Sequence, residues 1–139
     1  MQSNIRKAFD KALVAMPLGL GATKTAFENV SFTPIDFEPY QASKLVPTVV
    51  DNPTFGDNYH RESGFYQVVL SYPKGKGVGT ITAMADKIKA YFKRGTTLIE
   101  GTDTIIVERT PTISAVYTND TRAELVIRIR YYCEQFEGV

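Results

Sequence analysis

The sequence contains few of the residues that most often carry out chemistry. It has one cysteine, Cys133, and one histidine, His60, among 139 residues. A single cysteine excludes an internal disulfide and a multi-cysteine zinc site, and it favours a reducing compartment. Any Ser-His-Asp or Cys-His arrangement would have to use His60, and no pair of carboxylates stands where their pKa values would be driven apart. The sequence therefore predicts no enzyme, no bound metal and no cofactor.

Long apolar runs are also missing. No stretch approaches the roughly 18 apolar residues that a membrane-spanning helix needs. Residues 1–21 have apolar residues separated by charged ones, without the continuous apolar centre of a signal peptide. We expect no membrane association, and a protein that acts where it is made or leaves by lysis of the cell.

Charge of one sign is not in excess. Sixteen basic and fifteen acidic residues leave a net charge of +1, which gives no general attraction to nucleic acid. A local basic patch remains open, since Arg128 and Arg130 together with Lys89 and Lys93 could lie among the tyrosines Tyr66, Tyr72 and Tyr132, as in platforms that stack bases. We favour the simpler interpretation, in which these cations belong to a solvated sheet face and a solvated helix face.

Two segments have the apolar spacing of amphipathic helices. We predict a first helix with Ser3 as its N-cap and Pro17 as its end, and a second that begins at Thr80 and is closed by Gly95. The first apolar stripe consists of Ile5, Ala8, Phe9, Ala12, Leu13 and Met16. The second consists of Ile81, Met84, Ala85, Ile88, Tyr91 and Phe92.

The remaining segments predict strands. They are residues 25–32, 40–50, 64–72, 112–116 and 122–134, with a hairpin at 97–109 that turns between Glu100 and Asp103. In the last strand five side chains share the buried face, namely Leu125, Ile127, Ile129, Tyr131 and Cys133. Prolines 34, 39 and 47 favour sheet edges or strand ends for the early strands. The sequence thus predicts one α+β domain, residues 1–139, with a mostly antiparallel sheet of about five to seven strands packed with two amphipathic helices.

The stretch YPKGKGVGT, residues 72–80, has the glycines and lysines of a phosphate-binding loop. A Walker loop needs Gly-Lys-Ser/Thr directly before the helix, and here Thr80 follows Gly79 without a lysine. A dinucleotide fingerprint needs G-x-G-x-x-G in a βαβ unit, and the spacing here is G-x-G-x-G. We therefore interpret Gly75, Gly77 and Gly79 as turn residues between a strand and a helix.

Residues 51–63, DNPTFGDNYHRES, are predicted to be a long loop. Loops of this length are often mobile or functional. An EF-hand register from Asp51 fails because Pro53 and Phe55 would fall at ligand positions. His60 is expected to be solvated there, beside Arg61 and Glu62.

An ordered set of motifs resembles a known family. The motifs are N-P-T-x-G at residues 52–56, R-E-x-G-x-[FY]-Q-V at 61–68, Y-P-x-G-x-G at 72–77 and F-x-R-G at 92–95. Segments outside them also agree, namely AFENVSFTP, RTPTI and VIRIRYY. In this order they are similar to the tail terminator, or tail completion, proteins of long-tailed bacteriophages.

The resemblance implies a structural role in the virion. Such a protein forms a ring, expected to be a homohexamer, at the head-proximal end of the tail. The ring caps the tube of the major tail tube protein, ends its polymerisation and docks the head–tail connector protein, while DNA passes through the lumen without specific binding. Assembly would take place in the host cytoplasm.

A ring needs two different surface patches on each subunit. We expect one at the proline-broken sheet edge and one at the loop, with Asn52, Pro53, Phe55, Tyr59 and Arg61 at a subunit or tube interface. Residues 49–62 are expected to become ordered against a neighbour. Arg128 and Arg130 would lie on a basic face or line the lumen. The alternatives are a head–tail connector or neck protein, another minor tail protein and, less favoured, a nucleic-acid-binding accessory protein.

Overall fold

The structure, a computed structural model, describes residues 2–28, 30–34, 37–51, 59–75, 77–119 and 121–136. Its helices are α1 (Gln2–Ala15), the short 3-10 helix η1 (Ala22–Lys24) and α2 (Gly79–Tyr91). Its strands are β1 (Thr25–Ala26), β2 (Tyr40–Asp51), β3 (Tyr59–Pro73), β4 (Thr97–Glu100), β5 (Asp103–Val107), β6 (Thr112–Ile113), β7 (Tyr117–Thr118) and β8 (Arg122–Phe136).

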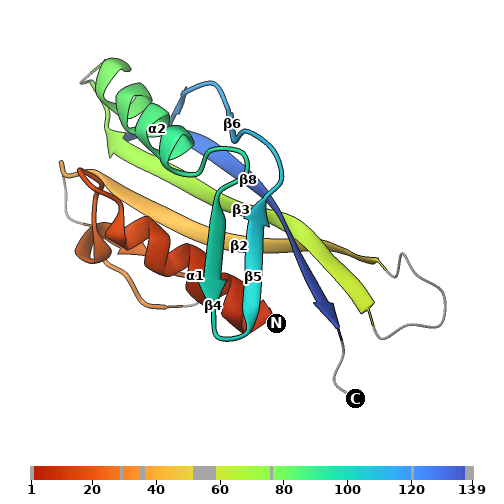
Figure 1. The fold of residues 1–139 in the computed structure, drawn as a ribbon. Coiled ribbons are helices and arrows are strands. Elements are labelled where there is room, and N and C mark those ends of the chain that lie inside the picture. Colours follow the sequence, from red (N-terminus) through yellow and green to blue (C-terminus); the bar gives the residue numbers. More distant parts are fainter. Residues whose placement is uncertain are drawn as a thin grey trace.

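All described strands belong to one sheet with the order β1-β2-β3-β8-β5-β4 (Figure 1). The short strands β6 and β7 also pair with β8, at residues that β5 leaves free. Only the β1–β2 pair is parallel. The long strands β2, β3 and β8 form the centre, and β3 pairs with β8 along its whole length, from Tyr59 opposite Phe136 to Pro73 opposite Arg122. The predicted α+β class with a mostly antiparallel sheet is confirmed. The described part of the chain has eight strands where five to seven were predicted, and three of the eight (β1, β6 and β7) are only two residues long.

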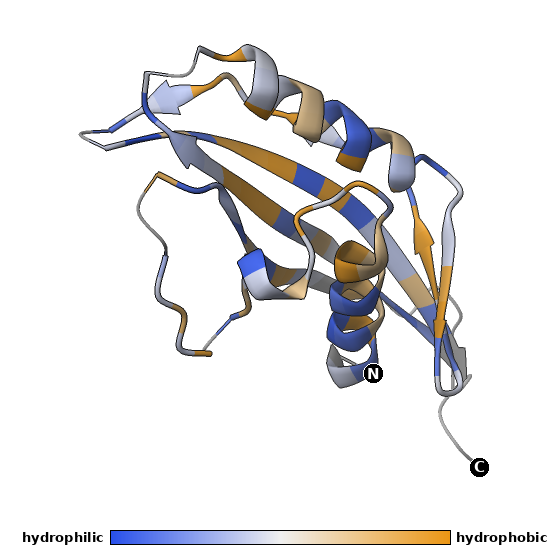
Figure 2. Ribbon diagram, turned by 90° about the vertical axis from the view of Figure 1, so that its left-hand side faces the viewer, coloured by the Kyte–Doolittle hydropathy of each residue, from blue (hydrophilic) through white to orange (hydrophobic). Residues whose placement is uncertain are grey.

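Both helices pack on the same face of the sheet. Side chains alternate along the long strands, which Figure 2 shows as apolar and polar bands. The Phe9 ring of α1 stacks on Tyr66 of β3 with ring centroids 4.7 Å apart, and it lies 6.0 Å from the ring of Phe92 just after α2. The five side chains predicted to share the buried face of the last strand are all buried, as is Leu45 on β2. The face away from the helices is called the open face below.

The segment 72–80 connects β3 to α2, as predicted. Gly75 and Gly77 have φ angles of 88° and 73°, which are conformations that glycine adopts without strain. Gly79 differs, because it is the first residue of α2 and a Cβ added there would meet open space. Two of the three glycines therefore serve the turn.

Three predictions about the helices need correction, two on their ends and one on the apolar stripe of the second. Helix α1 begins at Gln2, so Ser3 lies inside its first turn and is not the N-cap. Tyr91 is exposed because Phe92 takes the core position at the end of α2. Gly95 does have a positive φ of 88°, but it lies three residues beyond the Phe92 C-cap, where its N–H donates to the carbonyl of Val107 at 2.9 Å.

Two predicted strand boundaries are also wrong. Among the described residues of the expected strand 25–32, only Thr25 and Ala26 pair with β2. The side chain of Glu28 then takes the place of a strand partner and accepts a hydrogen bond from the N–H of Leu45 at 3.1 Å. Residues 59–63 are not loop. They are the first part of β3, since β8 extends to Phe136 and supplies them with partners.

Candidate assembly surfaces

The loop expected at an interface lies almost wholly outside the described residues. This holds for Asn52, Pro53 and Phe55, and the expectation that residues 49–62 become ordered against a neighbour stays a prediction. Tyr59 is the first residue of β3, and its side chain is not described. The structure does place the base of this hairpin, which projects from the sheet end opposite the start of β2 (Figure 1).

Arg61 lies in β3 on the open face, and contacts within the chain already hold its guanidinium. It forms an ion pair with Glu134 of β8 and lies over the ring of Tyr132 at 4.7 Å from the centroid. The pair and the ring join the ends of β3 and β8. Arg61 therefore stiffens the projecting part of the sheet, and an interface role for it stays a prediction.

The open face combines apolar and cationic side chains. The register places Ala42, Val69 and Val126 in one row across β2, β3 and β8. The next rows are Lys44, Gln67 and Arg128, then Val46, Phe65 and Arg130. Because the helices pack on the other face, these apolar side chains have no core to enter, and this favours a protein partner for the open face.

Arg128 and Arg130 both lie on the open face, as the alternation predicted. Arg130 is paired with Glu108 at 3.3 Å. Arg128 lies 5.5 Å from the centroid of the Phe65 ring and donates to the Gln67 amide oxygen at 3.4 Å. Arg128 has no anionic partner among the described residues. Its charge, unlike that of Arg130, is therefore available to a binding partner. Tyr66 and Tyr72 are buried, which counts against the alternative of a base-stacking patch at these two tyrosines.

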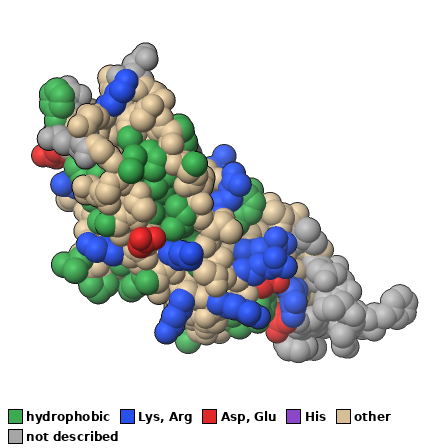
Figure 3. All heavy atoms as spheres, turned by 90° about the horizontal axis from the view of Figure 1, so that it is seen from above, with side chains coloured by type: hydrophobic (Ala, Val, Ile, Leu, Met, Phe, Trp, Pro, Cys, Tyr) green, Lys and Arg blue, Asp and Glu red, His purple; other side chains and the backbone are tan. Residues whose placement is uncertain are grey.

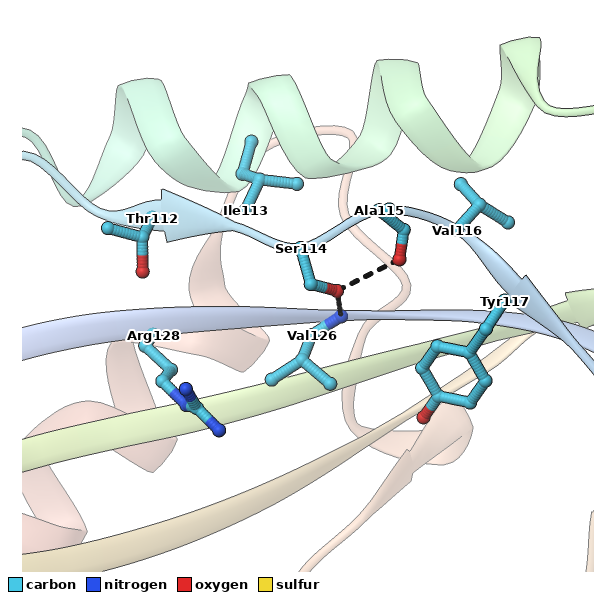
Figure 4. Close-up of a pocket in the computed structure, with 8 residues that line it drawn as sticks. All are labelled: Thr112, Ile113, Ser114, Ala115, Val116, Tyr117, Val126 and Arg128. Atoms are coloured by element: carbon cyan, nitrogen blue, oxygen red, sulfur yellow. Dashed lines mark hydrogen bonds between the residues drawn. The ribbon is translucent and has the colours of Figure 1, made fainter.

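An open groove of about 570 Å³ lies beside Arg128. It is lined by Thr112, Ile113, Ser114, Ala115, Val116, Tyr117, Val126 and Arg128 (Figure 4). The segment between β6 and β7 is held to β8 by Ser114, whose N–H donates to the carbonyl of Val126 at 2.9 Å and whose hydroxyl accepts from the Val126 N–H at 2.9 Å. Figure 4 shows Tyr117, Val126 and Arg128 projecting away from α2, while Ile113 and Val116 point towards it. The groove is thus part of the open face.

The β2 edge is the proline-broken edge that the sequence predicted. It is covered by β1 opposite Gln41 and Ala42 and by Glu28 at Leu45. Backbone N–H groups point alternately to the two sides of a strand, so after Leu45 the next N–H that would point away from β3 belongs to position 47. That residue is a proline, which has no N–H. A register shift follows between Pro47 and Val49. The edge is therefore closed to pairing over its first half.

Helix α2 gives the molecule a basic surface. Lys87, Lys89, Lys93 and Arg94 are exposed at or just after its C-terminal end, and Asp86 is the one acid of α2 itself. Figure 3, which views this side, shows more Lys and Arg than Asp and Glu. None of the four cations has an ion-pair partner among the described residues. This surface is distinct from the open face, so each subunit has at least two unlike surfaces.

Two residues outside the glycines have a left-handed backbone in the described part of the chain, Leu18 with φ 60° and Phe37 with φ 65°. They are also its most exposed large apolar side chains, at 81% and 86%. Strained, exposed apolar residues are more often kept for function than for stability. Sequence reasoning missed both; the only signal was a phenylalanine between two acids, in IDFEP at residues 35–39.

The titratable groups of the interior serve packing. Burial, with a smaller contribution from nearby Asp103 and Glu62, raises the pKa of Cys133 to about 11, so its thiol stays protonated and poorly nucleophilic. His60 is in β3 and largely buried, not in a solvated loop as expected; its Nε2 lies 3.7 Å from a carboxylate oxygen of Glu62. Cys133 lies opposite Glu62 in the register of β3 and β8, and its side chain is fully buried.

Among the described residues, no three His, Cys, Asp or Glu side chains are grouped as metal ligands would be. Neither helix in the described ranges has the length and apolarity needed to cross a lipid bilayer.

Two unlike surfaces on one subunit are typical of structural proteins that assemble into larger particles. The family model for the phage tail terminator protein matches residues 4–131, and the chain belongs to that family. It is a structural component of a bacteriophage tail, as the motif resemblance implied.

Solved structures show the same fold. Seven chains match, and one of them superposes with a TM-score of 0.78 at 24% sequence identity, over 100% of this chain and 99% of its own length. Among curated proteins, none matches the chain.

Proposed function

We propose that this protein forms a ring, expected to be a homohexamer, that caps the completed tail tube, ends its polymerisation and offers its other side to the head–tail connector. The family match over residues 4–131 is the observation that carries the proposal. The ring would lie at the head-proximal end of the tail, and its assembly would take place in the host cytoplasm.

The unlike surfaces of the subunit support this role. A closed ring needs a heterologous interface, in which one patch of each subunit binds a different patch of the next. The tail tube stops growing when one side of the ring binds the tube end and the other side does not bind a further tube subunit. Specificity then comes from the surface that does not fit. The open face and the α2 surface differ in the way this requires, since the first mixes apolar and cationic side chains and the second is mainly cationic.

DNA passage sets a further condition on the ring. A lumen lined with unpaired cations would hold each phosphate that it met. We therefore propose that the basic α2 surface, with Lys87, Lys89, Lys93 and Arg94, faces a protein partner on one side of the ring. Arg130 is neutralised by Glu108, so it is more suitable than Arg128 for a lumen position.

The test is a phage that lacks the protein. We expect electron micrographs to show tubes of variable and excessive length, and purified protein added to polymerising tube protein to restore a narrow length distribution. A connector or neck protein would instead leave tail length uniform and heads unattached. Normal, uniform tails joined to heads in its absence would refute the proposal.

A further inference from the structure

Phe37 is held in an exposed position at a cost in backbone free energy. Its φ of 65° is unfavourable for a residue with a Cβ, and its ring is 86% exposed. Neither the strain nor the exposure stabilises the single subunit. A surface that binds this ring in the assembled particle would account for both.

Glu38 gives the same point of the surface a negative charge. Its carboxylate has no cationic partner among the described residues, although its backbone carbonyl accepts a hydrogen bond from Arg122 at 2.8 Å. That bond, together with Arg122 lying 4.7 Å from the centroid of the Tyr40 ring, fixes the segment to the start of β2 and β8. Phe37 and Glu38 therefore place an exposed apolar ring and a negative charge on one short segment that Arg122 ties to the sheet, called the projection below.

The groove of the open face has the complementary properties. Its floor is Val126, flanked by the Tyr117 ring and by the Arg128 guanidinium, which has no anionic partner in the described ranges (Figure 4). The volume of about 570 Å³ exceeds that of a phenylalanine side chain. An aromatic ring placed there would meet apolar and aromatic surface, with a cation at one end.

The two features do not meet within one subunit. Tyr40, two residues after Glu38, is opposite Ser71, and Ser71 is opposite Glu124. Arg128 lies four residues farther along β8, roughly 13 Å at about 3.3 Å per residue. The groove and the projection are thus separate patches on one chain, as a head-to-tail contact requires.

We propose that Phe37 and Glu38 of one subunit occupy the groove of the next, with the Phe37 ring against Val126 and Tyr117 and the Glu38 carboxylate paired with Arg128. We identify the occupant as a second copy of this chain because the carboxylate of Glu38 and the guanidinium of Arg128 have opposite charges. The inference deepens the proposed ring and rests on it. Each copy donates one projection and accepts one, so the contact repeats around a ring.

Cysteine cross-linking tests the contact directly. In tails assembled from the full chain carrying both Phe37→Cys and Ala115→Cys, oxidation should give a ladder of covalent oligomers up to the closed ring, reversed by reductant. Ala115 is exposed on the groove and Cys133 is buried, so the native thiol does not interfere. Each single cysteine variant should give no ladder. Absence of a ladder in the double variant, or a dimer as the largest product, would overturn the proposal.

Charge reversal provides a second test. Glu38→Arg and Arg128→Glu should each abolish length control of tails, and the combined variant should restore most of it. Lys7→Glu, an exposed residue of α1 that belongs to neither the groove nor the open face, and Ile99→Ser, an apolar residue 70% exposed on β4, are matched controls that should retain it. Thermal unfolding would show that every variant folds.

The outcomes separate the two proposals. If the wild-type protein caps tubes and both single reversals also cap them, the Phe37 contact is wrong and the terminator role stands. If tails are uniform without the protein, the terminator role is wrong, and the cross-linking of assembled protein still decides whether this contact exists.

Discussion

The hydroxyl of Tyr66, on the central strand β3, donates a hydrogen bond to the carboxylate of Asp10 on helix α1. The ring of the same tyrosine stacks on Phe9, so one side chain fixes both the apolar and the polar contact of α1 with the sheet. Burial raises the pKa of Tyr66 strongly, and the neighbouring Asp10 charge raises it further. The phenol therefore stays protonated and acts as a donor.

We expect Tyr66→Phe to lower the free energy of unfolding by about 1–2 kcal/mol, because the Asp10 carboxylate loses a donor while the ring stack is kept. Ser43 also hydrogen-bonds Asp10, and this keeps the loss near the lower end of that range. Urea unfolding measures the difference. Tyr91→Phe, on an exposed ring at the end of α2, is the control and should change stability by less than about 0.5 kcal/mol. Equal losses in the two variants would mean that the Tyr66 hydroxyl contributes nothing specific.

Gly64 should be irreplaceable for a steric reason. A Cβ at this position would lie 2.4 Å from the carbonyl oxygen of Val46 and 2.8 Å from the Cα of Pro47, both backbone atoms of β2 at its register shift. We expect Gly64→Ala to destabilise the subunit by at least about 1–3 kcal/mol, as overpacking does, since β2 has to move away from β3.

Gly79→Ala is the matched control. A Cβ there meets open space at the first position of α2, and alanine favours the helix. We expect unchanged or slightly higher stability, about 0–1 kcal/mol, measured in the same denaturant series. A loss comparable to that of Gly64→Ala would contradict the steric explanation.

Much of this fold is predictable because periodicity alone defines it. Alternation along residues 122–134 identified the buried face of β8, and the spacing of Ile5, Phe9 and Leu13 identified the buried face of α1. The turn between Glu100 and Asp103 was identified by its glycine, and the two residues are paired in the structure. These are local signals, so they need no knowledge of distant partners.

The errors arise where a distant segment decides the local structure. Residues 59–63 look like loop until the length of β8 gives them a partner. The strand expected at 25–32 ends at Ala26 because Glu28 reaches Leu45, seventeen positions away. The groove was not predictable for the same reason, since Tyr117 and Arg128 meet only through pairing of β6 and β7 with β8.

Glu28 should make stability depend on pH. Burial opposes its ionisation, but the hydrogen bond from the Leu45 N–H and the Arg6 guanidinium outweigh burial and lower its pKa. A carboxyl whose pKa is lowered by folding stabilises the protein above its ordinary pKa, and this contribution is lost as pH falls through the lowered value. Glu28→Gln should therefore be less stable than the wild type by about 1 kcal/mol at pH 7, a value reduced for partial exposure.

The comparison over pH is the informative measurement for Glu28. As pH falls from 7 through about 4.5 and below, the stability difference between wild type and Glu28→Gln should shrink towards zero. Lys11→Gln, which removes the exposed pair with Glu100, is the control and should cost less than about 0.5 kcal/mol at every pH. A difference for Glu28→Gln that does not change with pH would show that packing, and not charge, is what the substitution alters.

Leu18 offers a direct measure of the strain at the surface. Its φ of 60° is unfavourable with a Cβ, and an 81% exposed side chain loses little burial when removed. We expect Leu18→Gly to raise the free energy of unfolding by about 1 kcal/mol, because relief of the left-handed strain outweighs the extra entropy of glycine in the unfolded chain. Val30→Gly, on an exposed residue without a positive φ, should lower it by about 0.5–1 kcal/mol through that entropy alone. If both glycines lowered stability equally, Leu18 would carry no strain, and the same reasoning at Phe37 would lose its support.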